Sequence, residues 1–415
     1  MTAKLEIQRL FKVYGPRPDD AIRAVESGGT PAEIFKKSGQ MVAVADVSFS
    51  VRAGEIFTIM GLSGSGKSTL VRCINRLIEP SAGSVRLDGE DVSAMSRQEL
   101  RALRRGKIAM VFQGFALLPH KTVQENVEFG LMIRGEPEAV RKERAGAALE
   151  RVGLSGWASR YPDNLSGGMK QRVGLARALA SNPDVLLMDE PFSAVDPLIR
   201  SELQRELLKL QREIKKTIVF ITHDFHEAVR LSDRLAVMRD GKFVQVGSPH
   251  EIVLRPVDDY VGTFARDLDR AKILCAGDIA QMRVPLVASG APAIEALATM
   301  RRSGKGCALI VDVQKAPLGY VLRGDLEHRG DLASVTVLEF RRGNVVSVPH
   351  STQLTSIYPL VDGQSPLAVL DADGRVAGAL DASDVLKQLT ETRGETVSAP
   401  SSEPAVPAAI QARRA

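Results

Sequence analysis

Apolar and polar residues follow two different spacings in the first 270 positions of the chain. Mainly apolar runs at 55–60 and 185–188 predict strands that are buried on both faces, as in a parallel sheet covered by helices. The segment 70–78 has instead the spacing of a helix. Because one buried strand leads into a helix and a second buried strand follows, we expect a doubly wound α/β sheet.

The pattern near the N-terminus predicts a helical insert at about 15–40. One helix covers 20–26, and a second begins at Thr30-Pro31-Ala32-Glu33, which has a cap residue, proline at the first helical position and glutamate to complete a capping box. A strand at 42–47 follows the insert. Farther on, Ser96 and Glu99 form another capping box, which predicts a solvated surface helix with a dense basic run: Arg97, Arg101, Arg104, Arg105 and Lys107.

An internal repeat of 59 positions begins near residue 275. Each copy predicts the order strand, helix, strand, turn, strand, helix, with a hairpin turn at 371–374 in the second copy. The residues that align are Asp312, Gly319 and Asp325 with Asp371, Gly378 and Asp384. We therefore expect a first domain at 1–270 and a repeated α/β domain at 275–392, divided into 275–332 and 333–392. The Pro/Ser/Ala-rich segment 393–415 is predicted to be a disordered tail.

Composition is that of an ordinary globular protein. The 415 residues are 44% hydrophobic and 25% charged, and the formal net charge of +5 is too small to argue for a nucleic-acid partner. The basic run after Ser96 leaves an acidic lipid surface or nucleic acid as a minor alternative. The three cysteines show no C-x-x-C pattern, so we expect neither a disulfide framework nor a zinc site. No apolar run approaches a membrane span and no secretory signal is present, which together favour a reducing cytoplasm.

The most specific chemical signal lies between the strand at 55–60 and the helix that follows it. The P-loop pattern G-x-x-x-x-G-K-[ST] is matched by Gly61, Leu62, Ser63, Gly64, Ser65, Gly66, Lys67, Ser68 and Thr69. A glycine-rich turn here directs backbone N–H groups and the positive end of a helix dipole at one spot, which suits a di- or triphosphate. We expect Lys67 to reach the β- and γ-phosphates and the Ser68 hydroxyl to coordinate Mg²⁺.

Two downstream segments add to this site. Asp189 and Glu190 end the buried run at 185–188, so they are expected beside the P-loop. Asp189 can hold Mg²⁺ through its water shell, and Glu190 can orient or deprotonate a water molecule. Ser166 can cap a helix that opens Ser-Gly-Gly, whose free N–H groups at Ser166, Gly167 and Gly168 form a second anion site.

Together these segments resemble the ATP-binding subunit of ABC transporters. The P-loop, LSGGMKQR and VLLMDE occur in the family's order with Gln113 in VFQGF, Asp196 in SAVDP and His223 in FITHD. The resemblance implies a P-loop NTPase domain with antiparallel β and helical subdomains, and a head-to-tail homodimer in which ATP lies between one subunit's P-loop and the other's Ser166–Gly168. It also implies that Gln113 reaches Mg²⁺ and the attacking water, and that His223 contacts the γ-phosphate. Asp196 would line the dimer seam, and Tyr14 would stack on adenine.

Two departures narrow the resemblance to one branch of that family. The strand at 42–47 is delayed by roughly 25 positions relative to most ABC subunits, and this insert, with FALLPH and DPLIR, is similar to the glycine betaine/proline (quaternary amine) importers. The repeated C-terminal domain resembles a tandem pair of CBS modules, which that branch carries. The resemblance implies import of glycine betaine, proline or a related quaternary amine as an osmoprotectant. The region after Gln113, up to about residue 160, would contact membrane subunits.

CBS modules often bind adenine nucleotides through the pattern G-h-h-[ST]-x-x-D. Asp325 and Asp384 keep the ribose position, but Leu322 and Asp381 replace the hydroxyl, and Asp381 would place a negative charge where a phosphate should lie. Four alternatives therefore remain for what this domain responds to or does. It binds an adenine nucleotide, binds a different ligand, senses ionic strength, or regulates through packing alone.

The resemblance implies a peripheral ATPase on the cytoplasmic face of the inner membrane. Its partners would be integral membrane permease subunits and, indirectly, a periplasmic or lipid-anchored solute-binding protein. The alternatives are an importer of choline, histidine or another amino acid, a soluble ABC ATPase that acts on DNA or ribosomes, and an energy-sensing module. The soluble ATPases usually have two cassettes or long coiled-coil insertions, which this chain lacks. The intact Glu190 and His223 argue against a pure sensor.

Overall fold

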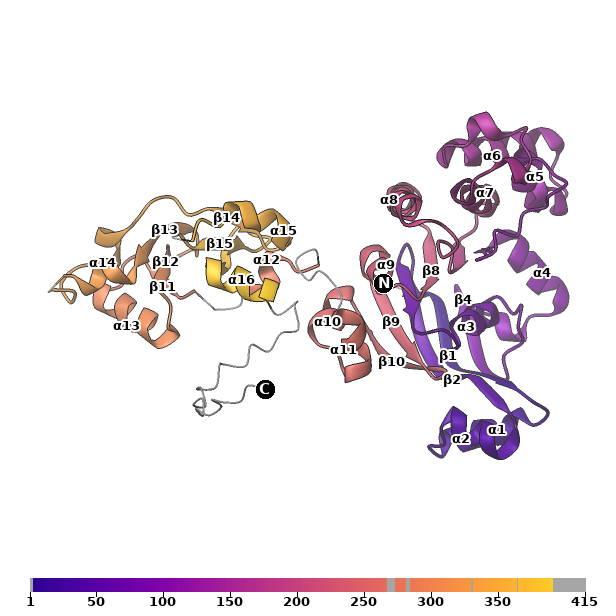
Figure 1. Ribbon diagram of the computed structural model, residues 1–415, viewed down its shortest axis with the longest axis horizontal. Coiled ribbons are helices and arrows are strands. Elements are labelled where there is room, and N and C mark those ends of the chain that lie inside the picture. Colours follow the sequence, from indigo (N-terminus) through magenta and orange to yellow (C-terminus); the bar gives the residue numbers. More distant parts are fainter. Residues whose placement is uncertain (1–2, 267–272, 281–283, 330, 364, 391–415) are drawn as a thin grey trace, which may run out of the picture. The chain divides into compact units, whose positions relative to one another are not determined.

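The computed structural model describes residues 3–266, 273–280, 284–329, 331–363 and 365–390, and the side chains of 387–390 are outside that description (Figure 1). The chain divides into two compact units, Met1–Ala265 and Arg266–Ala415. The division falls within α11 (Asp259–Arg266), slightly before the boundary that the sequence predicts. The predicted disordered tail at 393–415 lies outside the described residues.

A six-stranded sheet forms the centre of the first unit. Its order is β10 (Lys242–Gly247), β9 (Arg234–Arg239), β3 (Ile56–Met60), β8 (Thr217–Thr222), β7 (Val185–Asp189) and β6 (Ile108–Val111). All neighbours are parallel except β10, which is antiparallel to β9. Every residue of β3, β7 and β8 is buried, which confirms the two buried strands predicted from the apolar runs.

A second, antiparallel sheet packs over the first with a helix from the P-loop between them. Its order is β2 (Met41–Arg52), β1 (Ala3–Tyr14), β4 (Ala82–Leu87) and β5 (Glu90–Asp91). One hydrophobic core contains residues of β1 and β2, of α3 (Lys67–Ile74) and of β3 and β7. The helix that the sequence predicts at 70–78 is α3, which begins earlier than predicted, at Lys67, and ends at Ile74. This sandwich fixes the start of α3 at the carboxyl end of β3.

The helical insert predicted near the N-terminus is present as α1 (Pro18–Glu26) and α2 (Pro31–Ser38). Thr30 and Glu33 form the expected capping box at the start of α2. The two helices have a core of their own against the ends of β1 and β2, with Val25, Ile34 and Val42 buried.

The basic helix is α4 (Arg97–Gly106), and the capping box of Ser96 and Glu99 is confirmed. Most of its basic residues are exposed, but Arg104 is only partly so, because its guanidinium donates to the carbonyls of Asn75 and Arg76.

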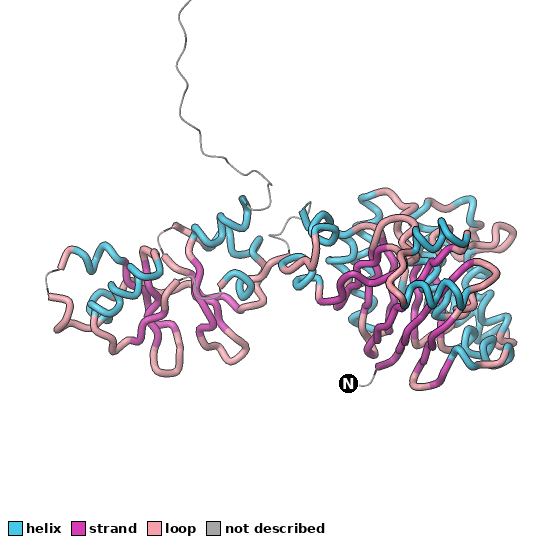
Figure 2. The backbone as a smooth tube through the Cα atoms, turned by 90° about the horizontal axis from the view of Figure 1, so that it is seen from below, coloured by secondary structure: helices cyan, strands magenta, loops and turns pink. Residues whose placement is uncertain are grey.

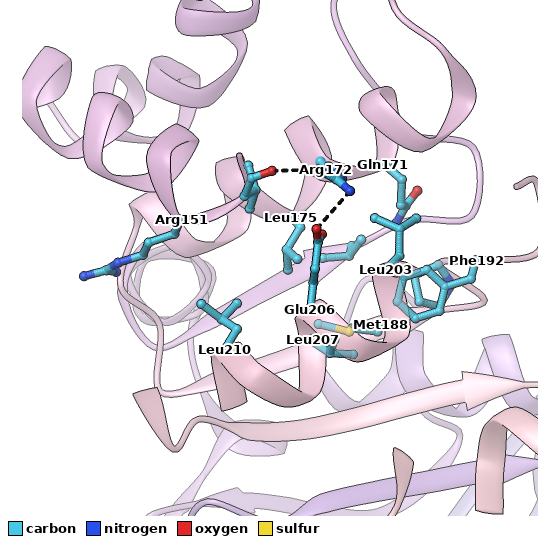
Figure 3. A pocket seen from close by; sticks show the side chains of 13 residues that line it. Arg151, Gln171, Arg172, Leu175, Met188, Phe192, Leu203, Glu206, Leu207 and Leu210 are labelled. Carbon is cyan, nitrogen blue, oxygen red and sulfur yellow. Dashed lines mark hydrogen bonds and ion pairs between the residues drawn. The ribbon is translucent and has the colours of Figure 1, made fainter. Parts of the chain in front are cut away.

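A further group of helices in the first unit lies at one end, away from β1 and β2 (Figure 1). They are α5 (Val123–Ile133), α6 (Glu138–Arg151) and α7 (Gly167–Ala180), and α8 (Pro197–Ile214) packs on α7. Figure 3 shows an apolar pocket between α7, β7 and α8, where Arg172 donates to the carbonyl of Val152 and pairs with Glu206 at 2.9 Å.

The first unit also contains three short helices, α9 (Phe225–Leu231), α10 (Pro249–Leu254) and α11. Among the described residues, none of the helices has the length and apolar character that a membrane span requires.

The second unit consists of two similar halves. Each half has a three-stranded sheet in which the first pair is parallel and the second antiparallel. The first half contains β11 (Leu286–Ala288), α13 (Ala293–Ser303), β12 (Cys307–Val311), β13 (Pro317–Leu322) and α14 (Arg323–Glu327). The second contains β14 (Ser347–Pro349), α15 (Leu354–Ile357), β15 (Leu367–Leu370), β16 (Val376–Leu380) and α16 (Ala382–Thr390), and α12 (Ala276–Ile279) packs on it.

The two halves share a buried interface. Figure 2 shows their strands side by side, and one apolar cluster contains Leu309 and Val311 of the first half with Ala368 and Ala379 of the second. Ile310 pairs with Gly319 in the first sheet as Val369 pairs with Gly378 in the second. The arrangement has the element order that the sequence repeat predicts.

A single lysine joins the halves electrostatically. The Lys305 ammonium lies 2.8 Å from both the Asp381 and the Asp384 carboxylates, and the Asp384 side chain is only 1% exposed. Burial by itself raises the pKa of Asp381, but hydrogen bonds from Lys305, Ser383 and the Asp384 amide outweigh it and bring that pKa down to about 2. Lys305 of the first half therefore places one positive charge between two carboxylates of the second half.

We predict that Lys305→Met destabilises the second unit by about 3–5 kcal/mol, because it removes the ammonium group that lies 2.8 Å from both the partly exposed Asp381 carboxylate and the buried Asp384 carboxylate. Amide exchange of β15 and β16 in a urea series measures this effect. Fluorescence of Trp157, the only tryptophan of the chain, should report unchanged unfolding of the first unit. The depressed pKa of Asp381 also implies that the contribution of this ion pair is complete above about pH 4 and is lost as the pH falls towards 2.

The matched control is Arg375→Met, since Arg375 pairs with Asp373 at 3.8 Å on an exposed hairpin and should cost less than about 1 kcal/mol. Equal effects of the two variants would contradict the structural role of Lys305.

Candidate active site

The loop from β3 to α3 is packed too tightly for side chains at two of its glycines. A Cβ on Gly61 would lie 2.2 Å from the Met238 carbonyl oxygen, and one on Gly66 would lie 2.1 Å from that of Ala43. Gly66 also has a φ of 103°, which side-chain-bearing residues rarely adopt. The backbone of the loop is thus held against β9 and β2, with Lys67 starting the helix directly after it.

Lys67 is nearly buried over this loop. Its ammonium donates to the carbonyls of Gly61 at 2.8 Å and Leu62 at 2.9 Å. Burial lowers the pKa of Lys67, and the charges of Glu190 and Asp189 only partly oppose this. A buried ammonium of this kind is stabilised by an anion at the loop.

Ser68 connects α3 to the end of β7. Its hydroxyl donates to the Asp189 carboxylate at 2.7 Å, and Arg72, one turn later on α3, donates to the other oxygen of Asp189 at 3.1 Å. Asp189 is 1% exposed, so its charge is directed towards these two groups. A hydroxyl and a carboxylate in contact are the oxygen donors that Mg²⁺ prefers.

Glu190 lies at the centre of a second cluster formed by the ends of β6, β7 and β8. Its carboxylate lies 3.0 Å from Nδ1 of His223 and accepts a long hydrogen bond, 3.4 Å, from the Gln113 side chain. Gln113 and His223 follow the strands on either side of β7. The parallel register therefore brings together three residues that are 77 and 33 positions apart in sequence.

The backbone of Glu190 is held in an unusual conformation. Its φ is 46°, and its N–H donates to the Ile221 carbonyl at 3.2 Å. The Ser193 hydroxyl donates to the Glu190 carbonyl at 2.9 Å. A left-handed glutamate is strained, and its two fixed backbone groups hold the carboxylate in one direction.

These residues fit a nucleoside triphosphate with a divalent cation. The loop offers backbone N–H groups at a helix start, and Lys67 offers a buried positive charge. The Ser65 hydroxyl is buried, and no hydrogen-bond partner for it is found among the described residues. Ser68 and Asp189 supply oxygen ligands, and Glu190 supplies a carboxylate that is fixed but still partly accessible.

The Ser166–Gly168 helix start lies apart from this cluster. Ser166 caps α7 by accepting from the Met169 N–H at 3.3 Å, as predicted, and remains exposed. Gly168 permits close packing, since a Cβ there would lie 2.4 Å from a methyl carbon of Ile199 on α8. Within the described ranges, no hydrogen bond joins Ser166, Gly167 or Gly168 to the P-loop of the same chain. Gly168 is buried, so the exposed Ser166 and the half-buried Gly167 form the part of this helix start that another molecule can reach.

Asp196 and Tyr14 lie on the surface. Asp196 is the exposed N-cap of α8 and accepts from the Ile199 N–H at 3.1 Å. Tyr14 ends β1 with 38% of its surface exposed, and the Lys12 ammonium lies 4.9 Å from the centre of its ring. A flat, exposed aromatic with a cation on it can stack on a base, so the predicted role of Tyr14 stays open.

The two carboxylates at the expected ribose positions of the second unit already have cationic partners. Asp325 receives two hydrogen bonds of 2.7 Å from the guanidinium of Arg342, and Asp384 is bound by Lys305. A ribose would have to displace these charge-assisted bonds. This geometry, like Leu322 and Asp381 in the sequence, argues against a nucleotide at these two positions.

Several contacts of the site were missed by sequence reasoning. Arg72, Ser193 and Lys12 have no motif of their own. Arg72 binds a residue that is distant in sequence, Ser193 binds a backbone carbonyl, and Lys12 lies over the ring of the nearby Tyr14. The four-residue spacing from Ser68 to Arg72, which places both on one face of the helix, is the signal that could have indicated a role for Arg72 beside the P-loop.

Comparison with known proteins agrees with this geometry. The protein-family model described as ABC transporter matches residues 44–193. The chain is 45% identical over 376 residues to the glycine betaine transport ATP-binding protein OpuAA of Bacillus subtilis, covering 90% of each protein. It is 55% identical over 281 residues to the glycine betaine/proline betaine transport system ATP-binding protein ProV of Escherichia coli, covering 68% of this chain and 70% of ProV.

Among solved structures, the dimeric ATP-binding cassette MJ0796 bound to ADP and Pi is similar, with a TM-score of 0.50 and 32% identity, covering 59% of this chain and 98% of that one. The similarity thus includes the cassette fold as well as the sequence motifs. The chain belongs to the ATP-binding proteins of ABC transporters, in the branch of the glycine betaine and proline betaine transport proteins.

Proposed function

We propose that this chain is the ATP-hydrolysing subunit of an importer for glycine betaine, proline betaine or a related quaternary amine. It would act at the cytoplasmic face of the membrane, bound to integral permease subunits that receive the solute from a solute-binding protein. ATP binding closes a dimer of this subunit and hydrolysis opens it again, and the permease follows these movements.

The observation that carries the choice of solute class is the similarity to OpuAA over 90% of both proteins. An alignment of 376 residues must extend well into the second unit, because the first ends at Ala265. The methionine import ATP-binding protein MetN of Caulobacter vibrioides is 50% identical, but over only 227 residues, which is shorter than the first unit. The cassette is therefore shared among importers, and the full architecture favours the quaternary-amine branch over amino-acid importers.

The described residues divide the chemistry among them. The loop N–H groups and Lys67 would bind the phosphates. Ser68 and Asp189 would hold Mg²⁺, with Asp189 oriented by its hydrogen bond from Arg72. Bound Mg²⁺ supplies positive charge that offsets the charge developing on the phosphate oxygens. Glu190 accepts the proton of the attacking water or orients it, while Gln113 and His223 hold the Glu190 carboxylate in place.

The exposed start of α7 supports a site shared between two subunits. The backbone N–H groups at Ser166–Gly168, of which Ser166 is exposed and Gly168 is buried, would face the nucleotide of the other subunit, with Asp196 along the seam. The dimeric state of the similar MJ0796 cassette agrees with this arrangement.

For the second unit we propose a tandem CBS pair with a regulatory role. The residues named in the P-loop cluster all belong to the first unit, and the ribose-position carboxylates of the second unit are bound by Arg342 and Lys305. These contacts disfavour a nucleotide at Asp325 or Asp384. They agree better with regulation by a ligand at another surface of the second unit, or by the ionic contact between its halves.

We predict that Glu190→Gln preserves ATP binding but slows hydrolysis by about 10²–10⁴-fold, because the amide accepts no proton from water. The nucleotide-bound dimer should then persist, which size-exclusion chromatography with MgATP can detect. Glu79→Gln is the control, since the Glu79 side chain is exposed and forms an ion pair with Arg76. Normal turnover in Glu190→Gln would remove Glu190 from its assigned role.

Mixed dimers test the shared site. When a Lys67→Ala subunit pairs with a Ser166→Arg subunit, one site receives both defects and the other receives neither. A mixture of the two variants should therefore hydrolyse ATP measurably, although each variant alone does not. If each site were built from one chain, every site in the mixture would contain a defect, and the mixture would be as inactive as its components.

A further inference from the structure

The backbone directly after Gln113 adopts a conformation that its side chains disfavour. Phe115 and Ala116 have φ values of 58° and 48°, although neither is glycine. The Ala116 N–H donates to the Gly114 carbonyl at 2.5 Å, which makes Phe115 the middle of a three-residue γ-turn of the rare, strained hand. Such a turn persists only when surrounding groups hold it.

Arg177 of α7 is the group that holds this turn. Its guanidinium donates to the Ala116 carbonyl at 2.6 Å and to the Phe115 carbonyl at 3.1 Å. Two donors on one planar group therefore bind two successive carbonyls. Burial is the sole cause that lowers the pKa of Arg177, so no described carboxylate offsets its charge. The carbonyls of the turn are its partners.

The turn lies along one face of α7. A Cβ on Gly167 would lie 3.9 Å from the tip of the Phe115 ring, and a Cβ on Gly174 would lie 3.7 Å from the Phe115 carbonyl oxygen. Residues 167, 174 and 177 are spaced by seven and three, which places them on one side of a helix. The same helix thus contacts the turn next to Gln113 and presents Ser166–Gly168 at its N-terminus.

We propose that Arg177 is a positioning residue that fixes the strained turn at 114–116 on α7 and thereby keeps Gln113 in reach of Glu190. This role rests on the proposed ATP hydrolysis. Gln113 is two residues from Phe115, and its contact with Glu190 is long, at 3.4 Å, so a small displacement of the turn breaks it. Arg177 and the α7 N-terminus belong to the same helix. When the proposed dimer closure moves the α7 N-terminus, the Arg177 contact therefore passes this movement on to Gln113.

The test uses the full chain, with its membrane subunits where hydrolysis requires them. Arg177→Met should lower kcat for ATP hydrolysis by about 10- to 100-fold, as expected for a misplaced catalytic group. The KM for MgATP should change little, because the P-loop is untouched. Amide exchange of 113–117 should increase.

A second substitution separates positioning from packing. Asparagine adopts the left-handed region several-fold more readily than alanine, so Ala116→Asn should stabilise the turn without its clamp. The double variant Arg177→Met/Ala116→Asn should recover most of the lost kcat and protect 113–117 from exchange. Arg172→Met is the matched control on the same helix, since Arg172 binds Val152 and Glu206 instead (Figure 3). Any loss that it causes should not respond to Ala116→Asn.

The outcomes distinguish this proposal from the proposed function. Unchanged kcat in Arg177→Met, or a loss that Ala116→Asn does not recover, overturns the positioning role while leaving ATP hydrolysis intact. Absence of hydrolysis in the unmodified protein would instead overturn the proposed function. If Trp157 fluorescence shows that Arg177→Met does not fold, Arg177→Lys replaces it. Lysine keeps the positive charge but lacks the planar pair of donors. Arg177→Lys should therefore lower kcat less than Arg177→Met would, and Ala116→Asn should again recover most of the lost kcat.

Discussion

The hydrogen bond from Ser68 to Asp189 is the contact on which the rest of the site depends. It joins the first turn of α3 to the end of β7, two segments that are 121 positions apart in sequence. The contact is possible because β8 alone separates β3 from β7 and because Gly61 and Gly66 let the loop approach its neighbours closely. Once these ends are aligned, Glu190 follows Asp189 at the same edge of the sheet, and the parallel strands on either side of β7 deliver Gln113 and His223.

Much of this could be predicted because the information is local. The apolar run at 185–188 is buried on both faces, and the boxes at Thr30 and Ser96 each cap a helix, since every one of these features depends on a few consecutive residues. The P-loop was recognisable for the same reason. The repeat in the second unit was visible because equivalent glycines and aspartates recur in step with the strands.

Other features depend on the packing of distant segments and had no local signal. The left-handed φ of Glu190 is set by bonds to Ile221 and Ser193, and sequence alone would place a strand end there. Arg72 is an ordinary helical arginine until β7 brings Asp189 next to it. Lys305 lies in the loop before β12, and its partners belong to the other half of the repeat. Sequence spacing could not reveal it as the cation of two carboxylates.

Strained residues border the reacting centre at two places, Glu190 on one side and the Phe115–Ala116 turn beyond Gln113 on the other. The first is held by backbone bonds within the sheet, so it is fixed in a single chain. The second is held by a side chain on α7, in the group of helices set apart from β1 and β2 (Figure 1). Glu190 is therefore fixed within one chain, whereas the position of Gln113 depends on α7. This arrangement suits the proposed hydrolysis if that reaction waits for a second subunit, because the Glu190 carboxylate is preorganised while its neighbour Gln113 responds to the position of α7.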